Sequence, residues 1–311
     1  PEEPRRVPRG LEDRGPHPSH FAVGTQEMED PGLAVAAPPG LLEVLALLEA
    51  TGLPRDLAHL LAQRGLATAV EAAAFLAPGL DSLHDPLLLK GMPEALDLLV
   101  AAHGRSEPVA VIGDYDVDGL TATALLLGVF QAVGIAAHGI LPNRHAGGYG
   151  PQIQHVQLAE ERGCRLLVTA DCGIQAHAAI AEARRRGMQV IVTDHHLPGA
   201  LPLAGAVVIN PRQDDCPYPF KDLAGVGLAL KLGAALLQRF GRQVPWSALC
   251  RISCLGTIAD AAPLVGENRV LASRGLAVLA ATPSLGLRAL FAEAAVVAPI
   301  SAQDVGFRIG P

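Results

Sequence analysis

Three aspartates stand on alternate residues in the stretch "VIGDYDVDGL", namely Asp114, Asp116 and Asp118. Neighbouring carboxylates raise one another's pKa, so such a group is costly unless a cation or a proton neutralises it. The spacing matches the start of an EF-hand calcium loop, including Gly119 at the sixth position. The twelfth position, however, holds Leu125 where that loop needs a bidentate Glu, and an apolar run precedes the loop in place of a helix. We therefore exclude an EF-hand.

Further polar residues follow two later apolar runs. Asp171 comes directly after "LLVTA", and Asp194, His195 and His196 come directly after "VIVT". In a parallel sheet the carboxyl ends of the strands share one edge, so all these side chains are expected to converge. For a single aspartate, capping of the next helix would be the favoured alternative, but it is a weak explanation for three. Carboxylates with an imidazole suit Mn²⁺ or Mg²⁺, and two ions about 4 Å apart would serve phosphoester hydrolysis.

Another acid, Asp260, occurs in the stretch "GTIADAAPL". By itself it is typical of a helix end before a proline. Beside a predicted metal site it becomes a candidate ligand, and we favour that role. The adjacent histidines are likewise candidates, because two neighbouring imidazoles after a strand are seldom needed for packing.

Two glycine-rich segments give weaker signals. In "NRHAGGYGP", Arg144 could pair with a phosphate and Tyr149 could stack on a base, although an ordinary loop is an equal alternative. In "LAGVGLALKL", Gly225 and Gly227 open a predicted helix whose N-terminus could receive a phosphate. That short motif is not specific.

The elements that must position these residues alternate between strands and helices. Apolar runs predict five strands, at 109–113, 136–141, 165–170, 189–193 and 206–210. Helical patterns lie between them, and several close on a glycine, which is the preferred residue after a helix end. The sequence therefore predicts an α/β fold, a parallel Rossmann-like sheet with helices on both faces. A helical lead-in precedes the sheet, and a helical C-terminal segment follows it.

Composition limits the class of protein. The 311 residues are 50% hydrophobic, which is ample for a large core, and the net charge of −7 argues mildly against a surface that binds nucleic acid everywhere. The five cysteines include no CxxC pair, which favours reduced thiols in a cytoplasmic protein. No apolar run reaches the ~18 residues of a membrane span, so no membrane partner is expected. The lack of an initial Met and the ending "GFRIGP" indicate a piece of a longer polypeptide.

Taken in order, the motifs "DYDVDG", "ADCG", "TDHH" and "GTIADAAPL" resemble those of the DHH phosphoesterases, named for the Asp-His-His triplet at 194–196. Within that superfamily the sequence is most similar to the RecJ-type exonucleases that degrade single-stranded DNA. The closer likeness lies in "LPNRHAGGYG", "LAGVGLALKL", "GTIADAAPLVGENR" and "VGFRIGP". It covers about residues 45–311.

The resemblance implies a role for each candidate. The implied metal ligands are Asp116, Asp118, Asp171, His195 and Asp260, for two Mn²⁺ or Mg²⁺ ions. Asp171 would bridge the ions, and Asp114 would support the first cluster from its edge. His196 would contact the scissile phosphate, and Asp194 would orient the histidines. The implied catalytic set is therefore Asp114, Asp171, Asp194, His195 and His196.

The remaining implied contacts are to the substrate and to partners. Arg144 and Tyr149 would lie along the substrate path. The substrate would be single-stranded DNA, shortened from its 5′ end during repair and recombination. The partners would be a single-strand-binding protein and a RecQ-type helicase.

Residues 1–38 are rich in Pro, Gly and charge, which predicts a disordered or loosely attached arm, and helical patterns predict a lead-in over 39–104. The resemblance implies that 105–311 form a DHH catalytic domain that stops before a second lobe (DHHA1) and an OB-fold. Two alternatives stay open. One is a DHH phosphoesterase acting on oligonucleotides, cyclic dinucleotides or pyrophosphate, and the other is a DNA-binding module without catalysis.

Overall fold

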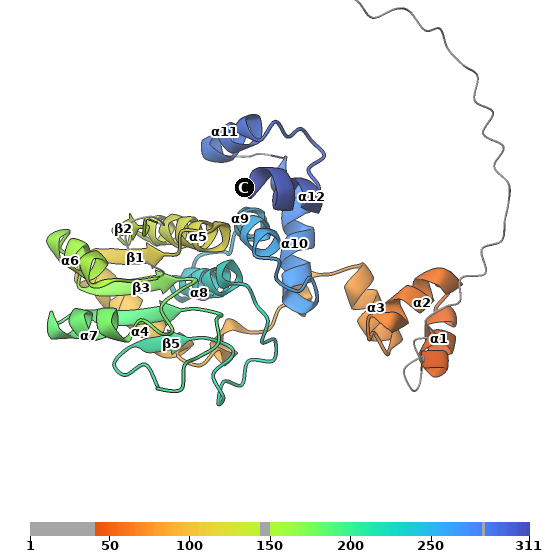
Figure 1. Cartoon of the computed structure of the whole chain (residues 1–311), viewed down its shortest axis with the longest axis horizontal. Coiled ribbons are helices and arrows are strands. Elements are labelled where there is room, and N and C mark those ends of the chain that lie inside the picture. Colours follow the sequence, from red (N-terminus) through yellow and green to blue (C-terminus); the bar gives the residue numbers. More distant parts are fainter. Residues whose placement is uncertain (1–40, 144–149, 282–283) are drawn as a thin grey trace, which may run out of the picture. The chain divides into compact units, whose positions relative to one another are not determined.

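The predicted alternation of strands and helices produces a five-stranded sheet in which every pair of neighbours is parallel (Figure 1). The computed structural model describes residues 41–143, 150–281 and 284–311, and everything below concerns these residues. The strands are β1 (Val109–Gly113), β2 (Ala137–Ile140), β3 (Leu166–Ala170), β4 (Gln189–Thr193) and β5 (Val207–Ile209). Each lies within one residue of its predicted bounds at both ends. The predicted fold class is confirmed.

The strand order is β2-β1-β3-β4-β5, which places β3 at the centre of the sheet. The last residues of β1, β3 and β4 are register partners, Gly113 with Ala170 and Ala170 with Thr193. The residues that follow these three strands therefore stand side by side along one edge. That edge carries the acids singled out in the sequence.

Successive side chains of the buried strands point to opposite faces, and each face has its own apolar core. Val109 and Val111 face a core shared with α4 (Met92–Gly104), α5 (Val117–Val133) and α8 (Gly225–Arg239). Ala110 and Ile112 face a second core shared with α6 (Ile153–Glu161) and α7 (His177–Arg185). Helices therefore cover both faces, as predicted.

Helix α8 is apolar on nearly all sides, which is typical of a helix enclosed by other elements. It contributes to the same core as α4, α5 and the sheet, and it also packs against α9 (Trp246–Ala259). The end of α5 shows the expected signal, because Gly134 has a φ of 80°. Similar left-handed glycines, Gly163 and Gly187, follow α6 and α7.

The lead-in consists of short helices before the sheet. They are α1 (Leu41–Glu49), α2 (Arg55–Gln63), α3 (Ala69–Leu76), and the single turns η1 (Leu80–Ser82) and η2 (Pro86–Leu88). The Arg269 guanidinium lies 3.6 Å from the centroid of the Phe75 ring, and Arg274 Nε donates to the Pro78 carbonyl at 3.1 Å. Two arginines of one later helix thus bind the segment at the end of α3.

That later helix is α10 (Gly266–Leu279), and it begins the C-terminal segment together with α9. The segment continues through α11 (Leu285–Glu293), α12 (Ala302–Asp304) and η3 (Val305–Ile309). Helices α9, α10 and α11 and the turn η3 share a third, smaller apolar core, which includes Leu279, Phe291 and Ile309. All five cysteines are free and buried. Along the described parts of the chain, no helix has both the length and the apolar character needed to cross a membrane.

Candidate metal centre

Three aspartates stand in a row across the carboxyl edge of the sheet. Asp114 follows β1, Asp171 follows β3 and Asp194 follows β4, each as the next residue after the strand. All three are at most 1% exposed. The register of the central strands is therefore what assembles the site.

The first acidic group spans the turn from β1 into α5. Asp116 caps α5, since its Oδ1 accepts the Gly119 N–H at 2.9 Å, so the capping alternative is realised at this one position. Asp114 Oδ1 accepts the N–H of Tyr115 at 2.8 Å, and burial raises the pKa of the Asp114 carboxyl. Gly119 packs so closely on Asp114 that an added Cβ would overlap the backbone of that residue.

Asp171 is the most constrained of the acids. Its backbone has a φ of 63°, a left-handed conformation that residues other than Gly adopt mainly at turns and functional sites. Burial, reinforced by the charges of Asp116 and Asp194, raises the pKa of Asp171 to about 9. Its Oδ1 lies 3.1 Å from His195 Nε2, yet neither atom has a hydrogen-bond partner within the described residues. These two buried ligand atoms thus lie next to each other, and both lack a hydrogen bond to any described residue.

Asp118 is held from the opposite side by the start of α8. Its two carboxylate oxygens accept the N–H groups of Gly225 at 2.7 Å and Val226 at 2.8 Å. The positive end of the α8 dipole therefore points at this carboxylate. Even so, burial and then the charge of Asp171 raise the pKa of Asp118 well above its usual range. The N-terminus of α8 thus reduces the free-energy cost of burying the Asp118 carboxylate but does not remove that cost.

Glycine makes this close approach feasible. A Cβ on Gly225 would overlap the Asp171 carboxylate, and one on Gly256, in α9, would crowd Thr121 and Asp118. Both helices reach the acids with backbone alone. Gly227 is also buried, but there a Cβ would meet only the flexible side chain of Leu223.

His195 connects the acids. Its Nε2 lies 4.0 Å from an oxygen of Asp118 and 4.0 Å from an oxygen of Asp260, which ends α9. Burial raises the pKa of Asp260 too. Three sets of ligand atoms lie close enough together to share an ion: Asp118, His195 and Asp260; Asp114, Asp116 and Asp171; and Asp171, His195 and His196. Carboxylate oxygens with one imidazole fit Mn²⁺ or Mg²⁺. An ion would complete the site at the Asp171 and His195 atoms that have no hydrogen-bond partner within the described residues.

The second histidine has a different environment. His196 Nδ1 lies 2.7 Å from Asp194 Oδ1, and the other oxygen of Asp194 accepts the Ile174 N–H at 2.8 Å. The hydrogen bond to Asp194 raises the pKa of His196 to about 9, so the ring is cationic at neutral pH. Asn210 also fixes the backbone at His196, since its Nδ2 donates to the His196 carbonyl at 2.9 Å.

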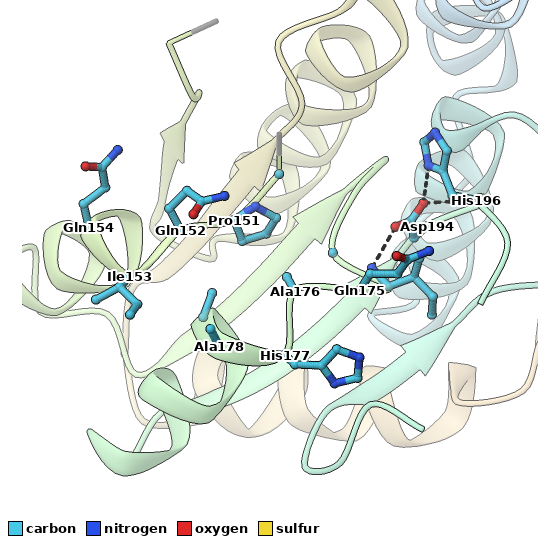
Figure 2. Close-up of a pocket in the computed structure, with 14 residues that line it drawn as sticks. Pro151, Gln152, Ile153, Gln154, Gln175, Ala176, His177, Ala178, Asp194 and His196 are labelled. Atoms are coloured by element: carbon cyan, nitrogen blue, oxygen red, sulfur yellow. Dashed lines mark hydrogen bonds and ion pairs between the residues drawn. The ribbon is translucent and has the colours of Figure 1, made fainter. Parts of the chain in front are cut away.

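A pocket of about 760 Å³ adjoins this histidine, and Figure 2 shows the side chains that line it. Asp194 and His196 lie at one end, while Gln152 and Gln154 of the α6 start lie at the other. The first turn of α7 forms the floor, with His177 among its residues. The partly exposed His196 side chain is therefore accessible from this pocket.

The structure brings together seven of the predicted residues: Asp114, Asp116, Asp118, Asp171, His195, His196 and Asp260. Asp194 adjoins them through His196. Arg144 and Tyr149 lie outside the described residues. Gly225 contributes its N–H to Asp118, a contact that sequence reasoning did not foresee, and Asn210 was missed as well.

Comparison with known proteins agrees with this arrangement. Residues 108–257 match the DHH family, N-terminal domain. The chain carries a DHH family domain. Its DHH domain and flanking segments are 39% identical over 271 residues to the single-stranded-DNA-specific exonuclease RecJ of Bacillus subtilis, covering 86% of this chain and 34% of that protein. The match to RecJ of Escherichia coli is 36% over 277 residues, covering 85% of this chain and 48% of the relative.

Solved structures show the same likeness. The crystal structure of RecJ in complex with Mn²⁺ from Thermus thermophilus is 35% identical with a TM-score of 0.70, covering 87% of this chain and 38% of that one. The complex of RecJ with Mg²⁺ from the same organism gives a TM-score of 0.61 at 32% identity, covering 87% of this chain and 34% of that one. This DHH chain is thus homologous to RecJ exonucleases and spans a third to a half of the length of the curated relatives named above.

Proposed function

We propose that this DHH domain hydrolyses phosphodiester bonds of single-stranded DNA from the 5′ end, with Mn²⁺ or Mg²⁺, as the catalytic core of a RecJ-like exonuclease in DNA repair and recombination. The observation that carries the proposal is a pair of buried ligand atoms, Asp171 Oδ1 and His195 Nε2, that have no hydrogen-bond partner among the described residues and lie amid acids with raised pKa. An unpaired buried charge is costly, so such a cluster must be neutralised by retained protons or by bound cations, and divalent ions would supply that positive charge.

We assign the ligands of two ions to Asp116, Asp118, Asp171, His195 and Asp260. Asp118, His195 and Asp260 would hold one ion, and Asp116 and Asp171 the other, with Asp114 at the edge of the second set. Asp171 is the proposed bridge, because it lies against His195 of the first set while its own group belongs to the second. Bound divalent ions would activate a water molecule and neutralise the phosphate oxygens.

The remaining catalytic work falls to side chains of the chain itself. Asp194 fixes the His196 ring and keeps it protonated, so His196 can donate a charged hydrogen bond to a phosphate oxygen. The ring is 45% exposed at the wall of the pocket, which leaves it accessible to that oxygen. We place the scissile phosphate between His196 and the ion ligands.

The proposed substrate contacts rest mainly on the sequence. Arg144 and Tyr149 are assigned to the DNA path on the resemblance of their motif to the RecJ segment. The predicted phosphate-binding role of Gly225 and Gly227 competes with Asp118, which already takes the N–H of Gly225. We therefore propose that the start of α8 serves the substrate indirectly, by holding a ligand.

The wider setting of the domain is also proposed. A cytoplasmic location is supported by five free cysteines, and a single-strand-binding protein and a RecQ-type helicase are the partners implied by the resemblance. We retain the division into an arm (1–38), a lead-in (39–104) and a catalytic part (105–311). Helix α4 ends the lead-in, yet it packs into the core of the sheet, so the last two parts should unfold together.

The test is degradation of labelled substrates by the 311-residue chain with Mn²⁺ or with EDTA. Single strands labelled at either end, duplex DNA, a linear dinucleotide, a cyclic dinucleotide and pyrophosphate separate the alternatives. Release of mononucleotides from the 5′ end of the single strand alone supports the proposal. Cleavage of only the small substrates would instead favour a small-molecule phosphoesterase, and retention of DNA without cleavage a binding module.

Asp171→Ala should abolish turnover, a loss of at least about 10³-fold, because it removes the proposed bridging ligand. Asp215→Ala is the matched control, since Asp215 is an exposed acid paired with Lys90. Circular dichroism checks that both variants fold. Near wild-type turnover in Asp171→Ala would refute the assigned site.

A further inference from the structure

Asn268 lies in the first turn of α10 and is completely buried, although it is outside the acidic cluster. Its side chain makes three hydrogen bonds. The Oδ1 accepts the Ala224 N–H at 3.2 Å, and the Nδ2 donates to the carbonyls of Asp222 at 2.6 Å and Pro263 at 3.1 Å. Only an amide side chain of this length offers one acceptor and two donors at these places.

Each of these bonds fixes a segment next to a proposed ligand. Asp222 and Ala224 lead directly into α8, and the next two N–H groups of the chain bind the Asp118 carboxylate. Pro263 follows Asp260 by three residues, in the turn between α9 and α10. One amide therefore joins the two chain segments that place Asp118 and Asp260.

We infer that Asn268 is a positioning residue that sets the separation of Asp118 and Asp260 on the two sides of His195, and so the affinity for the ion they share. Each acid has an oxygen 4.0 Å from His195 Nε2, so a shift of either segment would change the ligand spacing. The inference rests on the proposed function, because it concerns ligands assigned there. Partners that orient metal ligands are typically worth about 10- to 100-fold in metal affinity.

Asn268→Asp is the decisive variant because it keeps the size of the side chain. The new carboxylate can still accept the Ala224 N–H, but it has no donors for the two carbonyls, and it should push the two segments apart. Its added negative charge would by itself favour a cation nearby. Weaker metal binding in this variant would therefore show that the ligands have moved, since the added charge alone would strengthen binding. Asn268→Ala removes all three bonds without adding charge.

Tyr218→Phe is the control for general loss of stability. Tyr218 is buried, and its hydroxyl donates to Glu267, the residue beside Asn268, at 2.5 Å. The variant loses one buried hydrogen bond while leaving every bond of Asn268 in place. It should lower the melting temperature and leave metal affinity within about twofold of wild type.

The experiment measures Mn²⁺ affinity of the 311-residue chain by calorimetry and hydrogen exchange at the Gly225 and Val226 amides without metal. We expect both Asn268 variants to bind Mn²⁺ at least about tenfold more weakly and to exchange those two amides at least about tenfold faster. Should Asn268→Ala not fold, Asn268→Asp decides alone. Changes within twofold in both measurements would overturn the inference, as would equal changes in Tyr218→Phe. A wild-type chain that binds no Mn²⁺ would refute the proposed function, and the exchange rates would still decide whether Asn268 positions α8.

Discussion

Two groups of buried or partly buried ionisable side chains lie close to α8, and their charges are neutralised in different ways. The inner network consists of Lys231, Glu267 and Tyr218, all at most 1% exposed. Lys231 Nζ donates to Glu267 Oε1 at 2.5 Å and to the His84 carbonyl at 2.7 Å, and Tyr218 donates to the second Glu267 oxygen. Every charged atom of that carboxylate has a partner.

The edge cluster consists of Asp118, Asp171, His195 and Asp260, and its charges do not balance internally. Within the described residues, its acids form ion pairs only with histidine, and two of its ligand atoms have no hydrogen-bond partner. The difference shows that burial alone does not mark a functional site. What distinguishes the edge cluster is that the counter-charge must come from outside the chain.

The largest effect on stability is expected from a substitution that breaks the inner network. Lys231→Met leaves Glu267 buried without its cation, and should lower the free energy of unfolding by about 3–5 kcal/mol. Urea unfolding of the metal-free chain at pH 7 measures it. A change below about 1 kcal/mol would mean that the Lys231–Glu267 pair does not hold α8 to α10.

A gain in stability is expected from a substitution in the edge cluster. Burial raises the pKa of Asp171 to about 9, so as pH rises from about 4 towards 9 the unfolded chain loses a proton that the folded chain retains. This carboxyl therefore destabilises the metal-free fold at pH 7. Asp171→Asn should raise the free energy of unfolding by about 2–4 kcal/mol at pH 7, and much less at pH 4. Asn also tolerates the left-handed backbone found at this position.

Urea unfolding at the two pH values checks that prediction, with Asp215→Asn as the exposed control. A loss of stability at pH 7 in Asp171→Asn would show that the edge cluster is already neutralised from within. The contrast with the inner network would then disappear.

Mn²⁺ should sharpen the comparison further. At a concentration 100 times its dissociation constant, each bound ion should stabilise the wild-type chain by about 2.7 kcal/mol, and excess EDTA should reverse the gain. Asp171→Asn should lose most of this gain, whereas Tyr218→Phe in the inner network should keep it. Thermal unfolding with and without Mn²⁺ provides the measurement, and equal gains in both variants would contradict the assignment of Asp171.

The smallest effect concerns one imidazole at the rim of the edge cluster. The Asp194 hydrogen bond raises the pKa of His196 to about 9, so the pair stabilises the fold fully below about pH 6.5 and loses its contribution as pH rises through 9. In Asp194→Asn the pKa of His196 should fall towards about 6.5. NMR titration of the metal-free chain measures both values, and an unchanged pKa would show that Asp194 is not the partner that matters.

The sequence predicted the sheet and the convergence of its acids for one reason. Buried parallel strands are continuous apolar runs, and whatever follows them must meet at one edge, so Asp114, Asp171 and Asp194 could be placed without coordinates. The hydrogen-bond partners of the buried charges could not be placed in this way. The bond between Asp118 and the start of α8 joins residues 107 apart, and that between Lys231 and Glu267 joins residues 36 apart.

Such pairings depend on how helices pack, which leaves no local pattern in the chain. Lys231 and Glu267 look like ordinary helical charges, and Asn268 like an ordinary polar residue near a helix start. The sequence singles out Gly225 as a phosphate contact, whereas its N–H donates to the Asp118 carboxylate in this structure. A helix N-terminus attracts any anion, so the sequence could not distinguish a phosphate from the Asp118 carboxylate.

The two glycines that approach the acids, Gly225 and Gly256, have a consequence for how this protein can vary. At these two positions the main chain lies against the Asp171 and Asp118 carboxylates and leaves no room for a side chain. Substitutions that alter selectivity without displacing a carboxylate are therefore expected elsewhere, for example among the residues that line the pocket. A methyl group at either glycine should silence the centre while the distant hydrophobic layers stay intact, so the fold can outlive its activity.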